Sequence, residues 1–205
     1  MLRVAIKPTI LTLTLLWFTG AAAAQEVVKQ ADDAIESDFE IVLKAEADLE
    51  QIKSGFPRDP GGLALRARKS LKNVLERDVD TPFALRINED LGRAEEILAT
   101  HHFIIATFYL GKTTHGAKKG AESRLRQIVV EYPSFSKMDE VLLRLSELAF
   151  DLEHPEDASY FSNRLICANP NSTHLQEAFE QIYKVGGNVA SCDELLVRPL
   201  PATKP

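Results

Sequence analysis

The stretch of sequence that decides the fold runs from residue 101 to residue 135 and reads "HHFIIATFYLGKTTHGAKKGAESRLRQIVVEYPSF". Apolar residues recur at helical spacing before Gly111 and again from Ala117 onward, which indicates two amphipathic helices separated by a break. A Tyr-Pro-Ser element at 132–134 ends the second helix, because proline lacks the amide hydrogen that a helix interior requires. The stretch therefore predicts a helical hairpin.

A second hairpin follows the first. When the chain is aligned with itself, Tyr-Pro-Ser at 132–134 matches Asn-Pro-Asn at 169–171. The helix residues that match are Ala121 with Ala158, Ile128 with Leu165, and Val129 with Ile166. Alanine suits positions where paired helices approach closely, and such units stack side by side in tetratricopeptide arrays. The sequence predicts an all-α fold, a short α-solenoid of tetratricopeptide-like helical hairpins preceded by a long amphipathic helix.

Helix breakers divide the chain into five parts, and no stretch has the alternating pattern of a strand. The parts are a signal peptide at 1–24, a long amphipathic helix at 25–54, a Pro/Gly break at 55–62, the helical-repeat domain at 63–185 and a flexible tail at 186–205. The long helix carries an apolar seam with heptad spacing. One heptad position holds Val28, Ile35, Val42, Leu49 and Phe56, and its companion holds Ala31, Asp38, Ala45 and Ile52.

Within the repeat domain, helices are expected at 63–77, 81–111, 117–132, 137–152, 156–168 and 173–185. Thr81 and Pro82 predict the start of the second long helix, with Thr81 as its N-cap, while Ser136 and Asp139 resemble a capping box. That long helix keeps one apolar register through Ala84, Ile87, Leu91, Ala94, Leu98, His101, Ile105 and Phe108. The two long helices are expected to pack antiparallel along their seams.

The first residues have the parts of a secretory signal peptide. Arg3 and Lys7 precede the apolar run "ILTLTLLWF", and small residues lead to Ala24. We expect removal after Ala24 and a periplasmic protein, with no lipid anchor because no cysteine lies near that site. Loss of Arg3 and Lys7 takes the formal net charge from -6 to -8, which argues against a nucleic-acid partner.

Two elements, "ILATHHFIIATFYLGK" and "GAESRLRQIVVEYPSF", resemble the C-terminal half of the BamD family. That family is the repeat-built periplasmic component of the outer-membrane barrel-assembly machinery. The matching residues are Ala106, Phe108, Tyr109, Gly111, Ala121, Tyr132, Pro133 and Ser134. The resemblance covers residues 91–182 and implies a stack of hairpins in the half of the fold that docks other components of the machinery.

A cluster of cations marks the turn of the first hairpin in this otherwise acidic chain. It comprises Lys112, His115, Lys118, Lys119, Arg124 and Arg126. One interpretation is an ordinary solvated turn. The other is a docking patch for an acidic partner domain or for anionic headgroups at a membrane surface, formed by Lys112, Lys118, Lys119, Arg124 and Arg126.

The two cysteines, Cys167 and Cys192, leave two interpretations open. In an oxidising compartment they are expected to form a disulfide that ties the tail to the helix carrying Cys167, contributing roughly 3 kcal/mol. The alternative is one buried helical thiol and one loose thiol, since two cysteines are too few to indicate a disulfide framework.

The sequence gives no motif for catalysis, metal binding or a cofactor. His101 and His102 point about 100° apart on a helix, so they cannot grip one metal ion. A glycine-rich phosphate loop and a nucleophile elbow are both missing from the sequence. His101 is expected on the apolar seam. Four aromatic residues are expected in the hairpin core, with a peptide groove as the alternative: Tyr160, Phe161, Phe179 and Tyr183.

The leading functional hypothesis is a non-enzymatic periplasmic scaffold that binds another protein, with a role in outer-membrane protein assembly implied by the resemblance. A second hypothesis is a helical protein that self-associates through the seam of the first long helix. A third, from another class, is an envelope hydrolase. We expect no cofactor and no nucleic acid, and a protein partner such as the outer-membrane assembly barrel or its periplasmic domains.

Overall fold

The structure is a computed structural model that describes residues 10–55 and 59–202. Within these ranges, residues 10–25, 27, 31, 196 and 197 are described by their backbone alone. Its helices are α1 (Ile10–Lys53), α2 (Pro60–Arg77), α3 (Ala84–Leu110), α4 (His115–Glu131), α5 (Met138–Asp151), α6 (Pro155–Ala168), α7 (Leu175–Lys184) and α8 (Cys192–Val197). These described residues contain no strand. Among the same residues, no helix has an apolar stretch of the length that crossing a membrane requires.

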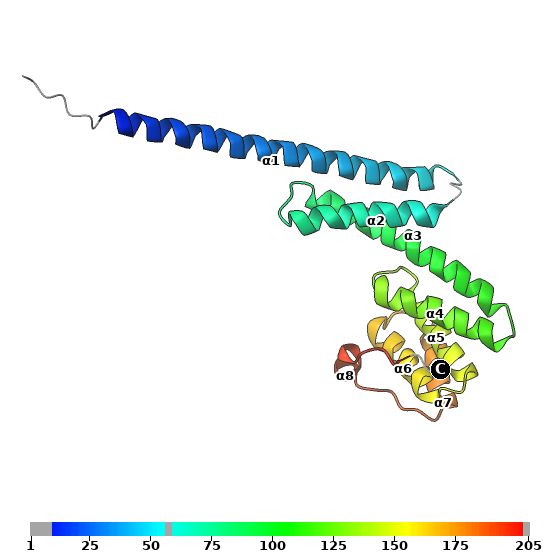
Figure 1. Ribbon diagram of the computed structural model, residues 1–205. Coiled ribbons are helices and arrows are strands. Elements are labelled where there is room, and N and C mark those ends of the chain that lie inside the picture. Colours follow the sequence, from blue (N-terminus) through cyan, green and yellow to red (C-terminus); the bar gives the residue numbers. More distant parts are fainter. Residues whose placement is uncertain (1–9, 56–58, 203–205) are drawn as a thin grey trace, which may run out of the picture.

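The helices stack in chain order (Figure 1). From α1 to α7 each helix packs against the next one, and α8 packs against α6. Contacts also join α1 to α3 and α5 to α7, as in arrays where every second helix lines one face. The predicted all-α solenoid of helical hairpins is therefore confirmed.

The two hairpins predicted from the internal match have the same local geometry. Ala121 and Ala158, which face the neighbouring helices, are both fully buried. Tyr132 caps the end of α4 with φ -133° and ψ 59°, and Asn169 caps the end of α6 with φ -132° and ψ 68°. Each cap amide donates to the carbonyl oxygen four residues earlier at 2.9 Å. The proline that follows each cap prevents either helix from continuing.

The apolar seam of α1 is covered only along its C-terminal half. Val42 and Leu49 are buried against α2 and α3, whereas Val28 and Ile35 are 60% and 43% exposed. The reason is length, because α1 has 44 residues and α2 has 18, so α1 projects past its partner (Figure 1). Phe56, the last residue of the predicted seam, lies outside the described residues.

Ion pairs fix the covered half of α1 on its neighbours. Carboxylates of α1 meet arginines of α2 and α3 in the pairs Asp48 with Arg66 at 2.8 Å, Glu50 with Arg93 at 2.5 Å, Asp38 with Arg77, and Glu46 with Arg86. Asp38 occupies a seam position and is 8% exposed. A buried carboxylate needs such a partner, which explains how an aspartate fits in this seam.

α1 begins at Ile10, so its helix is continuous through most of the segment predicted as a signal peptide. Residues 1–9 lie outside the described residues. The leucines of the apolar run and the alanines at 21–24 are strong helix formers, which favours a helix in this segment.

The register predicted for the second long helix fails after Leu98. Leu91 and Leu98 are buried, but further along α3 the buried positions are Ala99 and Ala106. The change follows from a change of partner, because the first part of α3 packs on α1 and α2 and the second part packs on α4. The expectation that His101 lies on the buried seam is wrong, since its side chain is exposed.

Of the helices predicted in the repeat domain, α2 and α3 begin farthest from their predicted starts. α2 starts inside the predicted 55–62 break, because Asp59 is its N-cap and accepts a hydrogen bond from Gly62 N at 2.8 Å. α3 starts at Ala84 and not at Pro82, because Thr81 belongs to the preceding turn and its Oγ1 accepts from Phe83 N at 3.5 Å.

The predicted capping box at the start of α5 is also wrong. Ser136 N donates to Glu96 Oε2 of α3 at 3.1 Å, and Ser136 Oγ donates to the other oxygen of the same carboxylate. The N-cap of α5 is Lys137, which makes no side-chain capping hydrogen bond. Ser136 therefore links α3 to the start of α5, because a carboxylate of another helix offers it two acceptors.

The tail is predicted to be flexible at 186–205, but its described part, residues 186–202, is docked along α6 and α4. It contains α8, and Leu195 is 6% exposed in the core. Tyr160 Oη of α6 donates to the carbonyl oxygen of Arg198 at 3.1 Å. The prolines of this segment do rule out a long helix, but side chains of the neighbouring helices satisfy its backbone groups.

Candidate docking surfaces

The five cations predicted as one docking patch do not form one surface. Lys112 is exposed, and its ammonium lies 5.0 Å from the centre of the Phe108 ring, which is itself 63% exposed. Lys118 pairs with Asp151 of α5 at 2.7 Å. Lys119 is half-buried in the second turn of α4. The α3–α4 turn therefore presents Lys112 beside an exposed aromatic ring, while Lys118 is neutralised by Asp151.

Arg124 lies farther along α4, away from the turn. Its Nη1 is 3.3 Å from His102 Nδ1 of α3 and donates to Gln127 Oε1 at 3.4 Å. Burial, followed by the nearby charge of Arg124, lowers the pKa of His102. Arg124 is therefore part of the α3–α4 packing and not of the basic turn.

Arg126 is not on the surface, since the residue is 8% exposed between α4 and α6. Its Nε donates to Glu122 Oε1 at 2.7 Å and its Nη2 donates to Asp157 Oδ2 at 3.4 Å. Its Nη1 donates to the carbonyl oxygen of Pro201 at 2.7 Å, and the guanidinium lies 5.0 Å from the ring centre of Phe161. Its assignment to a partner patch is therefore wrong. Its guanidinium donors are used by the buried carboxylates of Glu122 and Asp157 and by the backbone of the tail.

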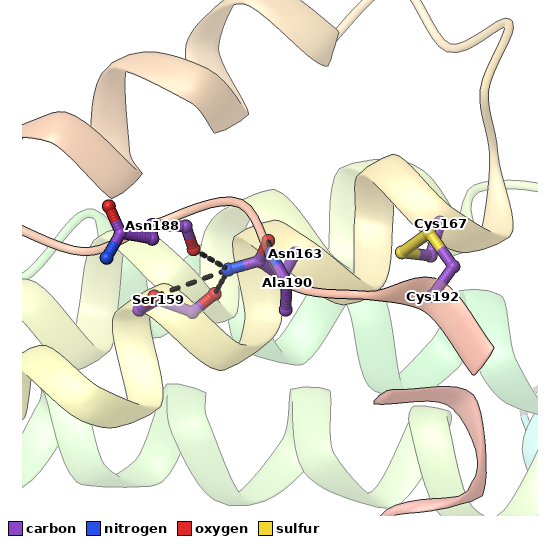
Figure 2. The surroundings of a disulfide bond; sticks show 6 residues. All are labelled: Ser159, Asn163, Cys167, Asn188, Ala190 and Cys192. Atoms are coloured by element: carbon purple, nitrogen blue, oxygen red, sulfur yellow. Dashed lines mark hydrogen bonds between the residues drawn. A yellow bond between two sulfur atoms is a disulfide. The ribbon is translucent and has the colours of Figure 1, made fainter. Parts of the chain in front are cut away.

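A disulfide joins Cys167, near the end of α6, to Cys192, at the start of α8, with the two Cα atoms 5.3 Å apart (Figure 2). One turn earlier on α6, the buried side chain of Asn163 holds the same segment. Its Nδ2 donates to the carbonyl oxygen of Asn188 at 3.1 Å, and its Oδ1 accepts from Ala190 N at 2.7 Å (Figure 2). One covalent bond and two hydrogen bonds thus lay the tail along α6.

An apolar groove lies between the end of α1 and the middle of α3, with a volume of about 610 Å³. This α1–α3 groove is lined by Leu49, Ile52, Lys53, Glu89, Gly92, Arg93, Glu96 and Ile97. Its surface is mostly apolar, and four of its lining residues carry charges of both signs. A Cβ atom placed on Gly92 would meet no heavy atom within 4 Å, so the space beside this lining residue is open.

Sequence reasoning missed the α1–α3 groove. The two long helices are expected to pack on each other along their seams, but α1 packs mainly on α2, α3 packs mainly on α2 and α4, and the contact between α1 and α3 is small. The one signal in the sequence is Gly92, a residue that disfavours helix in the middle of a strongly helical stretch.

The four aromatic residues expected in the hairpin core do not all lie there. Tyr160 and Phe161 are buried at 5% and 0% exposure, and Phe179 is half-buried. Tyr183 is 74% exposed at the end of α7, so its assignment to the core is wrong.

In the part of the chain that the structure describes, His, Cys, Asp and Glu side chains form no group that could hold a metal ion.

Comparison of the chain with family models, curated proteins and solved structures finds no match. The resemblance to the BamD family therefore rests on the residues quoted for it. In the structure several of them have packing roles. Ala106 and Ala121 are fully buried, Gly111 ends α3, and Tyr132 ends α4.

Proposed function

We propose that this protein is a non-enzymatic, periplasmic helical-repeat scaffold that binds another protein. The observation that carries the proposal is the apolar α1–α3 groove, which is open to solvent on a frame of packed hairpins. Apolar grooves between helices bind the apolar face of an amphipathic helix from a partner. A scaffold of this kind acts by presenting a surface of fixed shape.

The walls of the groove are held together before any partner arrives. Arg93 of α3 pairs with Glu50 of α1 at 2.5 Å and with Asp90 at 3.0 Å. Ile52 and Ile97 pack against both buried clusters, so the groove is continuous with the core. A preformed groove binds with a smaller loss of conformational entropy than a surface that must first become ordered.

The compartment and the role are the finer parts of the proposal. The signal-peptide pattern at 1–24 and the disulfide between Cys167 and Cys192 support an oxidising compartment such as the periplasm. The resemblance to the BamD family supports a role in outer-membrane protein assembly. The partner is then the assembly barrel or its periplasmic domains.

Affinity capture with a matched pair of variants tests the proposal. Gly92→Trp fills the α1–α3 groove, while Gly92→Ala adds a methyl group that meets no neighbouring atom. Each tagged protein is used to capture partners from detergent-solubilised envelopes of the source. The captured proteins are then identified by mass spectrometry. We expect the wild type and Gly92→Ala to recover the same partner, and Gly92→Trp to recover at least tenfold less.

If the wild type and Gly92→Ala recover the assembly barrel and Gly92→Trp does not, the role in outer-membrane protein assembly would be established. Equal recovery by Gly92→Trp would remove the groove as the binding site. Recovery of no partner by the wild type would refute the scaffold function itself.

A further inference from the structure

The N-terminal part of α1 projects beyond the rest of the molecule (Figure 1). We call residues 26–37 the α1 arm, and all of its described side chains are exposed. At about 1.5 Å per residue the arm is roughly 18 Å long. Its apolar residues Val28 and Ile35 are 60% and 43% exposed, so a partner that covers them would bury apolar surface.

The arm continues the apolar seam by which the C-terminal half of α1 packs against α2 and α3. Val28 and Ile35 occupy the same heptad position as Val42 and Leu49, which α2 and α3 bury. At the junction, Phe39 is 39% exposed, and its ring centre lies 5.6 Å from that of Phe83. The apolar seam therefore runs from the covered half onto the arm without a break in register.

Charge identifies what covers the seam. In the covered half, carboxylates in the seam or beside it meet arginines of α2 and α3 in four ion pairs. The arm repeats part of this pattern, because Asp32 and Glu36 lie two heptads before the paired residues Glu46 and Glu50. Its other carboxylates, Glu26 and Asp33, lie on the side of the helix away from the seam, and its single cation is Lys29. Within the described residues none of these four carboxylates has an ion-pair partner. The arm thus presents the carboxylate side of an interface whose arginine side is missing.

We infer that the α1 arm docks a basic amphipathic helix of another polypeptide, one with an apolar seam flanked by arginine or lysine. The inference rests on the proposed scaffold function and names a second surface and its partner class. α2 itself shows the chemistry, because its apolar face lies on α1 while Arg66 and Arg77 reach the carboxylates of α1. A second copy of the arm fits worse, since it would place carboxylates against carboxylates.

The two parts of the interface have different tasks. Burial of Val28 and Ile35 supplies most of the affinity, because exposed ion pairs are weak. The carboxylates select a basic partner and accelerate its approach, so binding should weaken as ionic strength rises.

Photo-crosslinking in cells of the source tests the inference on the full chain. A benzophenone amino acid replaces Ile35 on the arm, Leu85 as a control that is 76% exposed on α3, or Glu89 on the rim of the α1–α3 groove. Mass spectrometry maps each crosslinked peptide. We expect the Ile35 probe to mark an amphipathic helix with arginine or lysine flanks in another protein, and the Leu85 probe to leave that helix unmarked.

Charge reversal gives a second readout in the same cells. With the probe at Ile35, the pair Asp32→Lys and Glu36→Lys should lower the crosslink yield at least fivefold. These side chains are exposed, so the fold is expected to be unaffected. An unchanged yield would remove the electrostatic part of the inference.

The remaining outcomes separate this inference from the proposed function. A crosslink from Ile35 to a second copy of this chain, to a segment without basic flanks, or to nothing overturns the inference. If the Glu89 probe still marks a partner protein in that case, the scaffold function stands without the arm. If neither the Ile35 probe nor the Glu89 probe gave a crosslink, the inference about the arm and the scaffold function would both be rejected.

Discussion

Ser172 Oγ donates a hydrogen bond of 2.6 Å to Asp139 Oδ2 and so links the segment before α7 to the start of α5. One hairpin earlier, Ser136 donates to Glu96 of α3 in the same sense. Both serines follow the proline turn that ends a hairpin. Successive hairpins of this solenoid are thus joined by a serine on one and a carboxylate on the previous one, in addition to their apolar contacts.

The Ser172 link predicts a pH-dependent contribution to stability. Burial alone would raise the pKa of Asp139, but hydrogen bonds from Ser172 and from the Glu140 amide outweigh it and lower that pKa. A lowered pKa means stabilisation that is present above the unfolded value of about 3.9 and lost as pH falls through the folded value. Ser172→Ala should therefore lower the unfolding free energy by about 1 kcal/mol at neutral pH and by less in acid.

Urea denaturation at neutral and acidic pH measures this difference, and NMR titration should show a higher pKa for Asp139 in Ser172→Ala. Ser123→Ala, an exposed position on α4, serves as the control for which no pH dependence is expected. A cost for Ser172→Ala that stays the same in acid would mean that the hydroxyl acts through packing and not through the carboxylate.

Arg126→Ala should be strongly destabilising. The substitution removes the guanidinium from two carboxylates, Glu122 and Asp157, that are 3% and 4% exposed. Breaking a buried ion pair on one side typically costs about 3–5 kcal/mol. It also removes the hydrogen bond to Pro201, so limited proteolysis should cut the tail faster.

Arg144→Ala is the matched control for Arg126→Ala. Arg144 also pairs with two carboxylates, Glu140 and Glu147, but its side chain is 42% exposed. Surface pairs contribute about 0–1 kcal/mol, so this variant should unfold close to the wild type in urea. Equal losses for the two arginines would show that the buried network is not what makes Arg126 important.

The sequence predicts the fold well because the fold depends on local patterns. The match between 132–134 and 169–171 identifies two hairpins, and Ala121 and Ala158 prove to be equivalent buried positions. Register along α3 is harder to predict, because α3 exchanges one set of partners for another near Leu98. A single periodicity cannot describe a helix whose buried side changes along its length.

The surfaces are much less predictable from the sequence. Arg126 belongs by position to a basic cluster, yet two of its partners lie 31 and 75 residues further along the chain. The tail has the prolines of a flexible segment, yet Asn163 binds its backbone at two points. Such contacts depend on which helices meet in three dimensions, and neither composition nor spacing encodes that directly.

The disulfide should make an independent contribution to stability. Cys167 and Cys192 are 25 residues apart in the chain, and closing a loop of this length stabilises by about 3.5 kcal/mol in the chain-entropy estimate. We expect reduction with dithiothreitol to lower the unfolding free energy of the wild type by about 2–4 kcal/mol. The double variant Cys167→Ser and Cys192→Ser should match the reduced protein and should not respond to the reductant. A wild type that is equally stable with and without reductant would contradict this prediction.

Two glycines with equal space around them should respond oppositely to alanine. Neither Gly92, inside α3, nor Gly186, just after α7, would bring a Cβ atom within 4 Å of another group. Gly186 has φ +66°, a conformation that costs an L-residue roughly 1–2 kcal/mol, whereas Gly92 has helical backbone, where alanine gains about 1 kcal/mol over glycine.

Gly92→Ala should therefore raise the unfolding free energy by about 1 kcal/mol, and Gly186→Ala should lower it by about the same amount. Urea denaturation of both variants beside the wild type measures the two changes under one set of conditions. The pair isolates the backbone term, because the added methyl group contacts nothing in either place. If Gly92→Ala proved destabilising, the open space beside Gly92 would be contradicted. The α1–α3 groove that Gly92 lines would then be contradicted as well.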